Sequence, residues 1–267
     1  MKRYTSTDQQ LHWLSQIIAK ANRTFVPDKE DDSHTNLYFD ALANRIMGRW
    51  IKIRGTSVIF TLNLDNQNFE VLDNTQRVLA SFQTVSRSVK QIEKGIEDLL
   101  PTLGLNASGF SKELHYVIPE YSFKKDLVPA IDKDSLAEWK HFRQIANQAC
   151  SLLLGHAQVV SEIRVWPHHF DTGIYTLMNA NLGLGFGLAM EDSMAATPYF
   201  YMSGYPKNGV IDYTNIPEST LWKWELGEHW KGVILPIDRL ASKTDLEQMN
   251  LVEKFLIETF RWFIKQS

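Results

Sequence analysis

The sequence predicts an α+β protein made of two similarly ordered halves, each a helix, a four-strand antiparallel meander and a second helix. Two periodicities lead to this fold class: apolar residues recur every three or four positions in four segments, and between these segments they alternate with a period of two. With 267 residues, 44% of them apolar, the chain can bury a substantial core. We expect a single compact unit over residues 1–267, with halves at 7–104 and 134–267 joined by a connection at 105–133.

The first half begins with an amphipathic helix that Asp8 is expected to cap and that ends before Pro27. After residues 37–42, strict alternation predicts three strands of an antiparallel meander, carried by Val58, Phe60, Leu62 and Leu64, by Phe69 and Val71, and by Val78, Ala80 and Phe82. Ser86 or Ser88 then opens a second helix, and Gly104 closes it.

The second half repeats this order after a connection that contains one short strand candidate, Leu114 to Ile118. Ser135 and Glu138 have capping-box spacing ahead of a long amphipathic helix, and Thr244 and Glu247 have the same spacing ahead of the terminal helix. Strands are expected between them at 162–166, 170–178, 182–190, 198–203 and 231–237. An internal duplication would explain the shared order, and two meanders are then expected to join into one sheet with helices on one face.

Composition excludes several classes of function. The formal net charge of −3 gives no overall field that favours nucleic acid or an anionic membrane, so neither is an expected partner. No run of about 18 apolar residues occurs, and the first residues lack a signal-peptide pattern, so a cytoplasmic protein is expected. The single cysteine, Cys150, lies in an apolar helical segment and is interpreted as an inert core thiol.

The segment Trp166-Pro167-His168-His169-Phe170-Asp171 is the most unusual in the chain. Proline interrupts a strand, and such irregularities redirect side chains. In a strand, His169 and Asp171 would share one face, which makes them candidates for acid-base catalysis or for metal binding. A metal needs another ligand, for which the sequence offers Glu191, Asp192, His115 and His229. A structural His–Asp hydrogen bond, with Trp166 and Phe170 in the core, is the alternative.

Two further segments are candidates for a binding surface. Residues 182–190 place glycines, Gly185 among them, on one face of a strand, so a helix, an aromatic strand or a ligand must approach the backbone closely. Residues 198–205 place Tyr199 and Tyr201 on one face of the next strand, where their hydroxyls either line a pocket or reach water at the rim of a sheet. Trp222, Trp224 and Trp230 are expected in a loop that forms a lid or a subunit contact.

The chain resembles a bacterial family catalogued as a domain of unknown function. The residues that carry the resemblance run through nearly the whole chain: Leu11-His12-Trp13, Gln16-Ile17, Lys20, Leu37-Tyr38, residues 166–171, Pro198-Tyr199-Phe200-Tyr201 and Leu235-Pro236. The most specific motif is Trp-Pro-x-His-Phe-Asp, in which His168 stands at a position associated with an acidic residue. The resemblance implies a single unit and a bacterial cytoplasmic setting, and no established activity or cofactor.

Three functions follow as hypotheses. The first is a small-molecule-binding module around residues 166–171, with Trp166, His168, His169, Asp171, Gly185, Tyr199 and Tyr201 at the ligand. The second is a hydrolase-like enzyme that uses His169 and Asp171, with or without a divalent metal. The third is a homodimeric interaction protein that pairs through an exposed sheet face. The sequence does not identify a ligand, a metal or a cofactor.

Overall fold

The computed structural model of the chain describes residues 2–53, 55–121 and 127–266. It divides into two compact units, the first made of residues 2–140 and 165–170 and the second of residues 141–164 and 171–266. The chain passes from one unit to the other inside helix α3 (Lys133–Ala157), and the described residues of 105–133 belong to the first unit. That residues 1–267 act as a single unit stays a prediction; Met1, Arg54, residues 122–126 and Ser267 lie outside the described residues.

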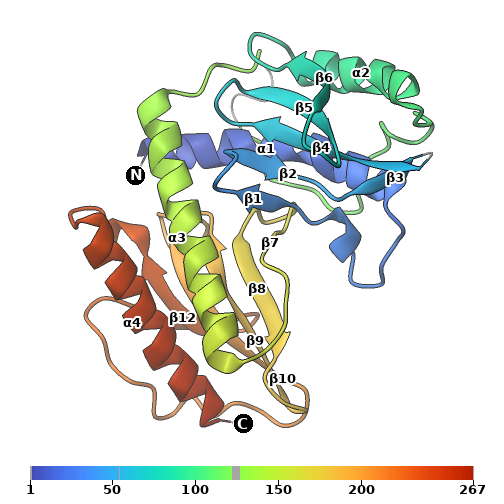
Figure 1. Cartoon of the computed structure of the whole chain (residues 1–267). Helices are drawn as coiled ribbons and strands as arrows, with labels where there is room; N and C mark the ends of the chain where they lie inside the picture. Colours follow the sequence, from blue (N-terminus) through green and yellow to red (C-terminus); the bar gives the residue numbers. More distant parts are fainter. Residues whose placement is uncertain (1, 54, 122–126, 267) are drawn as a thin grey trace. The chain divides into compact units, whose positions relative to one another are not determined.

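The first unit contains an antiparallel sheet in the order β1-β2-β4-β5-β6, with β3 paired to β4 (Figure 1). Its register places Leu62 opposite both Ile46 and Phe69, so apolar residues of neighbouring strands share one face. The strands are β1 (Tyr38–Asp40), β2 (Arg45–Met47), β3 (Ile51–Ile53), β4 (Thr56–Asn63), β5 (Asn68–Asp73) and β6 (Val78–Gln83).

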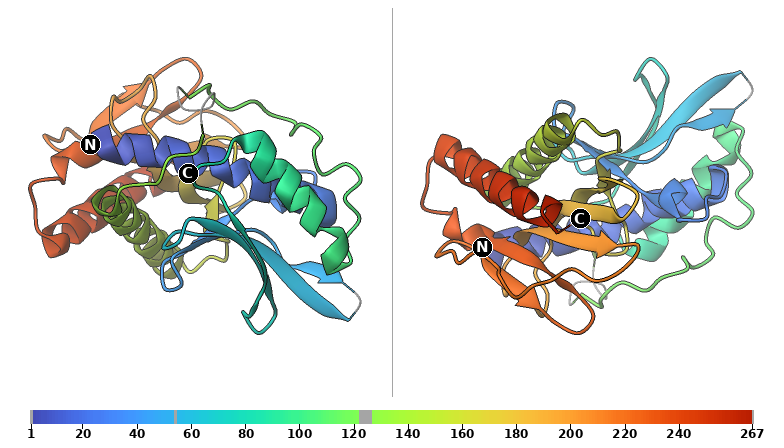
Figure 2. Two further views of the ribbon diagram at one scale, coloured as in Figure 1. Left: turned by 90° about the horizontal axis from the view of Figure 1, so that it is seen from above. Right: turned by 90° about the horizontal axis from the view of Figure 1, so that it is seen from below.

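Helices α1 (Lys2–Phe25) and α2 (Val89–Leu99) cover the same face of this sheet, as the two views of Figure 2 show. The ring of Phe25 stacks on that of Phe60 with centroids 6.5 Å apart. On α2, a Cβ added to Gly95 would lie 2.0 Å from the ring of Phe82, so only glycine lets the helix approach this closely. Short 3₁₀ turns follow α1 (Ser33–Thr35) and α2 (Pro101–Leu103).

The second unit contains an antiparallel sheet in the order β11-β12-β10-β9-β8-β7. Its strands are β7 (Arg164–Val165), β8 (Thr172–Leu177), β9 (Leu182–Ala189), β10 (Tyr199–Pro206), β11 (Lys223–Leu226) and β12 (Lys231–Pro236). A 3₁₀ turn (Ile237–Arg239) leads to helix α4 (Asp245–Ile264).

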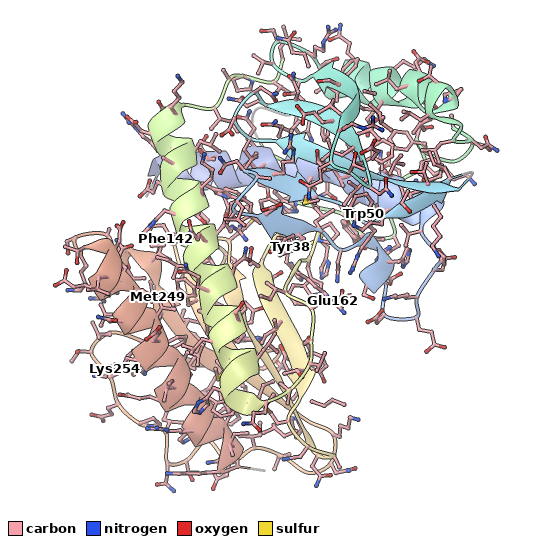
Figure 3. All side chains as sticks on the ribbon, in the orientation of Figure 1. Tyr38, Trp50, Phe142, Glu162, Met249 and Lys254 are labelled. Atoms are coloured by element: carbon pink, nitrogen blue, oxygen red, sulfur yellow. The ribbon has the colours of Figure 1, made fainter. Side chains whose placement is uncertain are left out.

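The part of α3 that belongs to this unit and helix α4 cover one face of the second sheet (Figure 1). Phe186 of β9 is fully buried and contacts both helices. Its ring lies 6.5 Å from that of Phe255 on α4, and its carbonyl oxygen lies 4.0 Å from the sulfur of Cys150 on α3. Figure 3 shows Phe142 on α3 and Met249 and Lys254 on α4. The helices therefore cover the leucine and phenylalanine face of β9, and its glycines face the opposite side.

The structure confirms the α+β class and corrects the expected sheet. In the described part of the chain the strands form two separate sheets of six strands each, so the expectation of one continuous sheet, and of four strands in each half, is wrong. The strands that were not expected are short: β2, β3 and β11 have three or four residues each. Conversely, residues 114–118 form no strand.

Two of the four expected helix caps are confirmed. Ser88 and Thr244 each form a full capping box, with Gln91 and Glu247 as the reciprocal partners. Asp8 and Ser135 are not caps, since α1 begins at Lys2 and α3 at Lys133. The Asp132 carboxylate accepts from both the amide and the hydroxyl of Ser135 and is the polar group at the start of α3.

Candidate functional site

The face of the second sheet opposite α3 and α4 carries tyrosines on top of glycines, and we call it the tyrosine surface: Tyr175, Tyr201 and Tyr205 over Gly173, Gly183, Gly185 and Gly187. These residues share a face because of the register. Tyr201 lies opposite Gly187, which in turn lies opposite Gly173, and Tyr205 lies opposite Gly183. The glycine face and the tyrosine face that the sequence indicates separately are therefore one surface.

Tyrosine rings occupy the space that side chains of β9 would otherwise fill. A Cβ on Gly183 would lie 2.4 Å from the Tyr175 hydroxyl, and a Cβ on Gly185 would lie 3.2 Å from the Tyr205 ring and 3.8 Å from the Tyr201 ring. Aromatic side chains of the neighbouring strands thus approach the glycine backbone, which is one of the explanations that the sequence left open. The rings of Tyr175 and Tyr205 meet edge to face, with centroids 5.7 Å apart.

Gly173 and Gly187 serve a different purpose from the other two glycines. A Cβ on Gly187 would lie 2.4 Å from the carbonyl oxygen of Thr172, and a Cβ on Gly173 would lie 2.5 Å from that of Phe186. Both contacts involve backbone, so a side chain at either position would push β8 and β9 apart. These two glycines set the spacing of the strands beneath Tyr201.

Asp171 anchors the half-buried end of the tyrosine surface. It immediately precedes β8, and its Oδ2 accepts a hydrogen bond of 2.6 Å from the hydroxyl of Tyr201. Burial raises the pKa of Tyr201 well above its ordinary value, and the negative charge of Asp171 raises it further. The phenol therefore stays protonated and holds the carboxylate in one orientation. Two of the expected site residues are brought together here.

A second tyrosine–aspartate pair lies two residues earlier on β10. The buried Tyr199 donates a hydrogen bond of 2.6 Å to Oδ2 of the exposed Asp192, while Asp192 Oδ1 accepts from the amide of Met194 at 2.7 Å. Burial raises the pKa of the Tyr199 hydroxyl, and the carboxylates of Asp192, Asp171 and Glu225 raise it as well. Asp192, expected only as a possible metal ligand, is thus the acceptor for a tyrosine.

The first unit holds the rest of the expected site, in a tight turn. The Phe170 amide donates to the Trp166 carbonyl at 2.6 Å, and Phe170 adopts a left-handed conformation with φ 56°. His169 is exposed, His168 and Trp166 are half-buried, and neither His169 nor Asp171 lies in a strand. The interpretation that these two residues share one face of a strand is therefore wrong, because the turn at Pro167 ends the period-two geometry on which it depends.

Helix α1 fixes this turn through a histidine and a glutamine that sequence reasoning did not assign to the site. His12 Nε2 and Gln16 Nε2 donate to the Pro167 carbonyl at 2.9 and 2.8 Å. The His12 ring also stacks on the buried Phe170, with centroids 5.2 Å apart. His12 and Gln16 are four residues apart, so they lie on the same side of the helix. This spacing is the feature of the sequence that could have indicated a shared role for the two residues.

Imidazole rings gather beside the turn without forming a metal site. The rings of His168 and His169 lie 4.4 Å apart, and Tyr116 lies 5.6 Å from His168 and 4.9 Å from His115. Within the described residues, no three histidine, cysteine, aspartate or glutamate side chains converge as metal ligands. The other candidate ligands, Glu191, Asp192 and His229, belong to the second unit.

Two buried groups of α3 complete the second unit. Arg143 is fully buried, and its Nη1 donates to the Thr172 hydroxyl at 2.9 Å, one residue after Asp171. Cys150 is fully buried, and burial raises the pKa of its thiol, as expected of an unreactive core cysteine. Nothing in the sequence pattern indicated the buried arginine, because it falls within an otherwise apolar helical stripe.

Two of the tryptophans that were expected in a loop pack on the helix side of the second sheet. Trp222 is buried against Phe255, with ring centroids 5.6 Å apart, and Trp224 lies in β11 with its ring 4.5 Å from that of Trp262. Trp230 lies on the opposite face, which it shares with Tyr201, and covers Gly232, where an added Cβ would lie 2.5 Å from its ring. The expected loop is therefore wrong for Trp224, whereas a lid or a subunit contact stays a prediction.

Comparisons with family models, curated proteins and solved structures found no match for this chain. The resemblance to an uncharacterised bacterial family stays a prediction. No helix in the described residues is both long and apolar enough to cross a membrane.

Proposed function

We propose that the protein is a small-molecule-binding module and that its ligand lies on the tyrosine surface, beside Asp171. The observation that carries this proposal is the hydrogen bond between Tyr201 and Asp171 at the edge of an aromatic surface with a glycine floor. Binding sites combine apolar contact area with a few fixed polar groups. The tyrosine rings supply the first, and the oriented carboxylate supplies the second.

Exposure of two of the rings supports a binding role rather than a purely structural one. Tyr175 is 47% exposed and Tyr205 is 42% exposed. Full burial of such large aromatic rings would stabilise the fold, so their exposure is not explained by packing. Leu177, on the same face of β8, is 45% exposed. An exposed aromatic patch of this kind is typical of interaction sites.

Native mass spectrometry of the purified protein, followed by an NMR screen with a fragment library, tests the proposal. Fragments that bind should shift the amide signals of β8, β9 and β10, and Tyr205→Ala should abolish these shifts. The matched control is Tyr38→Ala, which removes a tyrosine of equal exposure, 42%, from the first unit (Figure 3). A screen with no binders, or binders that Tyr205→Ala leaves unaffected, would overturn the proposal.

The two other hypotheses have different signatures in the same experiments. Self-association through the tyrosine surface would appear as a dimer in sedimentation analysis. The double variant Tyr175→Ser with Tyr205→Ser would then sediment as a monomer. A hydrolase that depends on His169 would lose turnover of a general ester substrate in His169→Ala. No observation within either unit favours these two hypotheses over ligand binding.

A further inference from the structure

The tyrosine surface is bordered by two carboxylates that accept hydrogen bonds from tyrosines. Asp171 and Asp192 each accept a hydrogen bond from a tyrosine hydroxyl, at 2.6 Å in both cases. Among the residues that the structure describes, no lysine, arginine or histidine forms an ion pair with either of them. A phenol hydrogen bond orients a carboxylate but leaves its charge in place, so both retain a negative charge that a ligand can neutralise.

The two lysines that lie within the strands of this sheet have other contacts. Lys223 pairs with Glu225 and also donates to the Met194 carbonyl at 3.1 Å. Lys231 lies over the ring of Tyr213, with its Nζ 5.7 Å from the centroid. The charges that act on the Tyr199 hydroxyl come from three carboxylates, Asp192, Asp171 and Glu225, and they raise its pKa. Three carboxylates therefore act on this side of β10.

Exposed aromatic rings add a second attraction for positive charge. The face of a tyrosine ring is electron-rich and attracts an ammonium group within about 6 Å of its centroid. Tyr175 and Tyr205 meet edge to face at 69°, so together they present two walls of a corner rather than one flat plate. The third ring, Tyr201, borders the same glycine, Gly185, as Tyr205 does.

From the aromatic corner and the unpaired carboxylates together, we propose that the tyrosine surface binds organic cations, meaning alkylammonium groups, in preference to neutral molecules of the same shape. This inference rests on the proposed function and names its ligand class. The ammonium group lies against the rings of Tyr175 and Tyr205, and the carboxylate of Asp171, which Tyr201 holds farther along the same surface, attracts the positive charge. Neutral isosteres keep the apolar contact with the rings but lose both electrostatic contributions.

Choline and its uncharged carbon analogue, dimethylbutanol, test the inference, because they have nearly the same shape and differ in charge. An NMR titration, at constant total chloride, should give a Kd for choline about tenfold lower than for the analogue, as expected for a cation–π contact with exposed rings assisted by a carboxylate. The shifts should map to β8, β9 and β10.

Variants of the exposed ring separate the possible origins of that preference. Tyr205→Leu keeps apolar area but removes the aromatic face. It should remove most of the tenfold difference between the Kd of choline and the Kd of the analogue. Tyr205→Phe keeps the ring and should retain the preference. Asp171→Asn removes the negative charge but keeps an oxygen that can accept from the Tyr201 hydroxyl, and it should weaken choline binding without affecting the analogue. Tyr38→Leu is the control in the first unit and should change nothing.

Each remaining outcome is decisive. Equal affinity for choline and the analogue, with both lost in Tyr205→Leu, would overturn the cation class and leave small-molecule binding at this surface intact. Choline binding that survives Tyr205→Leu unchanged would overturn the inference by placing the cation elsewhere. Binding of neither probe would overturn the cation inference, and the fragment screen would then decide the proposed function separately.

Discussion

The imidazole Nε2 of His12 donates a hydrogen bond of 2.9 Å to the carbonyl oxygen of Pro167, 155 positions away in the chain. Because a carbonyl can only accept, the proton must reside on Nε2, and in the neutral ring Nδ1 is then an acceptor for the Tyr121 hydroxyl at 2.7 Å. Gln16 donates to the same carbonyl. The motif around Pro167 is thus held by the first helix, whatever function the motif serves.

This arrangement predicts that His12 stabilises the first unit. His12→Phe keeps a ring on Phe170 but removes the donor, and it should lower the free energy of unfolding by about 1–2 kcal/mol. The double variant with Gln16→Leu leaves the buried carbonyl without a side-chain donor and should cost more than the sum of the single changes. Urea denaturation of the four proteins in a double-mutant cycle measures the difference. Strict additivity would contradict the shared role.

The glycines of β9 are predicted to differ in their tolerance of alanine. Gly187→Ala places a Cβ 2.4 Å from the backbone oxygen of Thr172 and should destabilise the second unit by about 1–3 kcal/mol. Gly183→Ala meets the hydroxyl end of the exposed Tyr175, which can move aside, so its cost should stay below about 1 kcal/mol. Thermal unfolding of both variants provides the test, and equal melting temperatures would argue against the backbone clash.

Alkaline pH should destabilise the second unit because of Tyr199 and Tyr201. The folded-state pKa of each is raised above the ordinary value, so their stabilising contribution is fully present below about pH 10. Above that pH the unfolded chain loses these protons first, and the free energy of unfolding falls by up to about 1.4 kcal/mol per pH unit for each proton. Urea unfolding between about pH 9 and about pH 11 should show a shallower slope for Tyr199→Phe. A slope identical to that of the unchanged protein would contradict the prediction.

Arg23 of α1 is predicted to organise the segment that follows α2. Its guanidinium donates to the backbone carbonyls of Lys112 and Glu113 and to those of Gly109 and Phe110. Arg23→Ala should lower the free energy of unfolding by about 1–3 kcal/mol and speed hydrogen exchange in residues 105–115. Lys94→Ala removes an exposed ion pair with Asp98 and serves as the control, with an expected change below about 0.5 kcal/mol. Unchanged exchange in Arg23→Ala would refute the prediction.

The long elements could be predicted because their signals are local. Ser88 and Thr244 begin helices through partners three residues away, and the alternation of β4 and β9 depends only on those strands. Asp8 has the composition of a cap, but its carboxylate accepts instead from the Trp139 indole at 2.7 Å, a contact across 131 positions that propensity cannot reveal. Short strands such as β2 likewise depend on pairing with β4 rather than on their own pattern.

The candidate site could be predicted only in its residue types. Tyr201, Gly185 and Asp171 were each selected from the sequence, yet the register that places Tyr201 opposite Gly187 is set by the packing of whole strands. The pairing of His169 with Asp171 depends on a strand that continues through both residues, whereas the left-handed Phe170 ends that geometry. His12 was missed because its role depends on a carbonyl in a distant turn.

The antiparallel bridge between Leu37 and Val165, with hydrogen bonds of 2.9 and 2.8 Å, draws a piece of later chain into the first unit. A gene fragment that ends at codon 140 would therefore encode a first unit without the partner of Leu37 and without the carbonyl that His12 binds. A fragment that begins at codon 141 would encode the second unit together with residues 165–170, which belong to the first. A single recombination point therefore cannot transfer either unit whole.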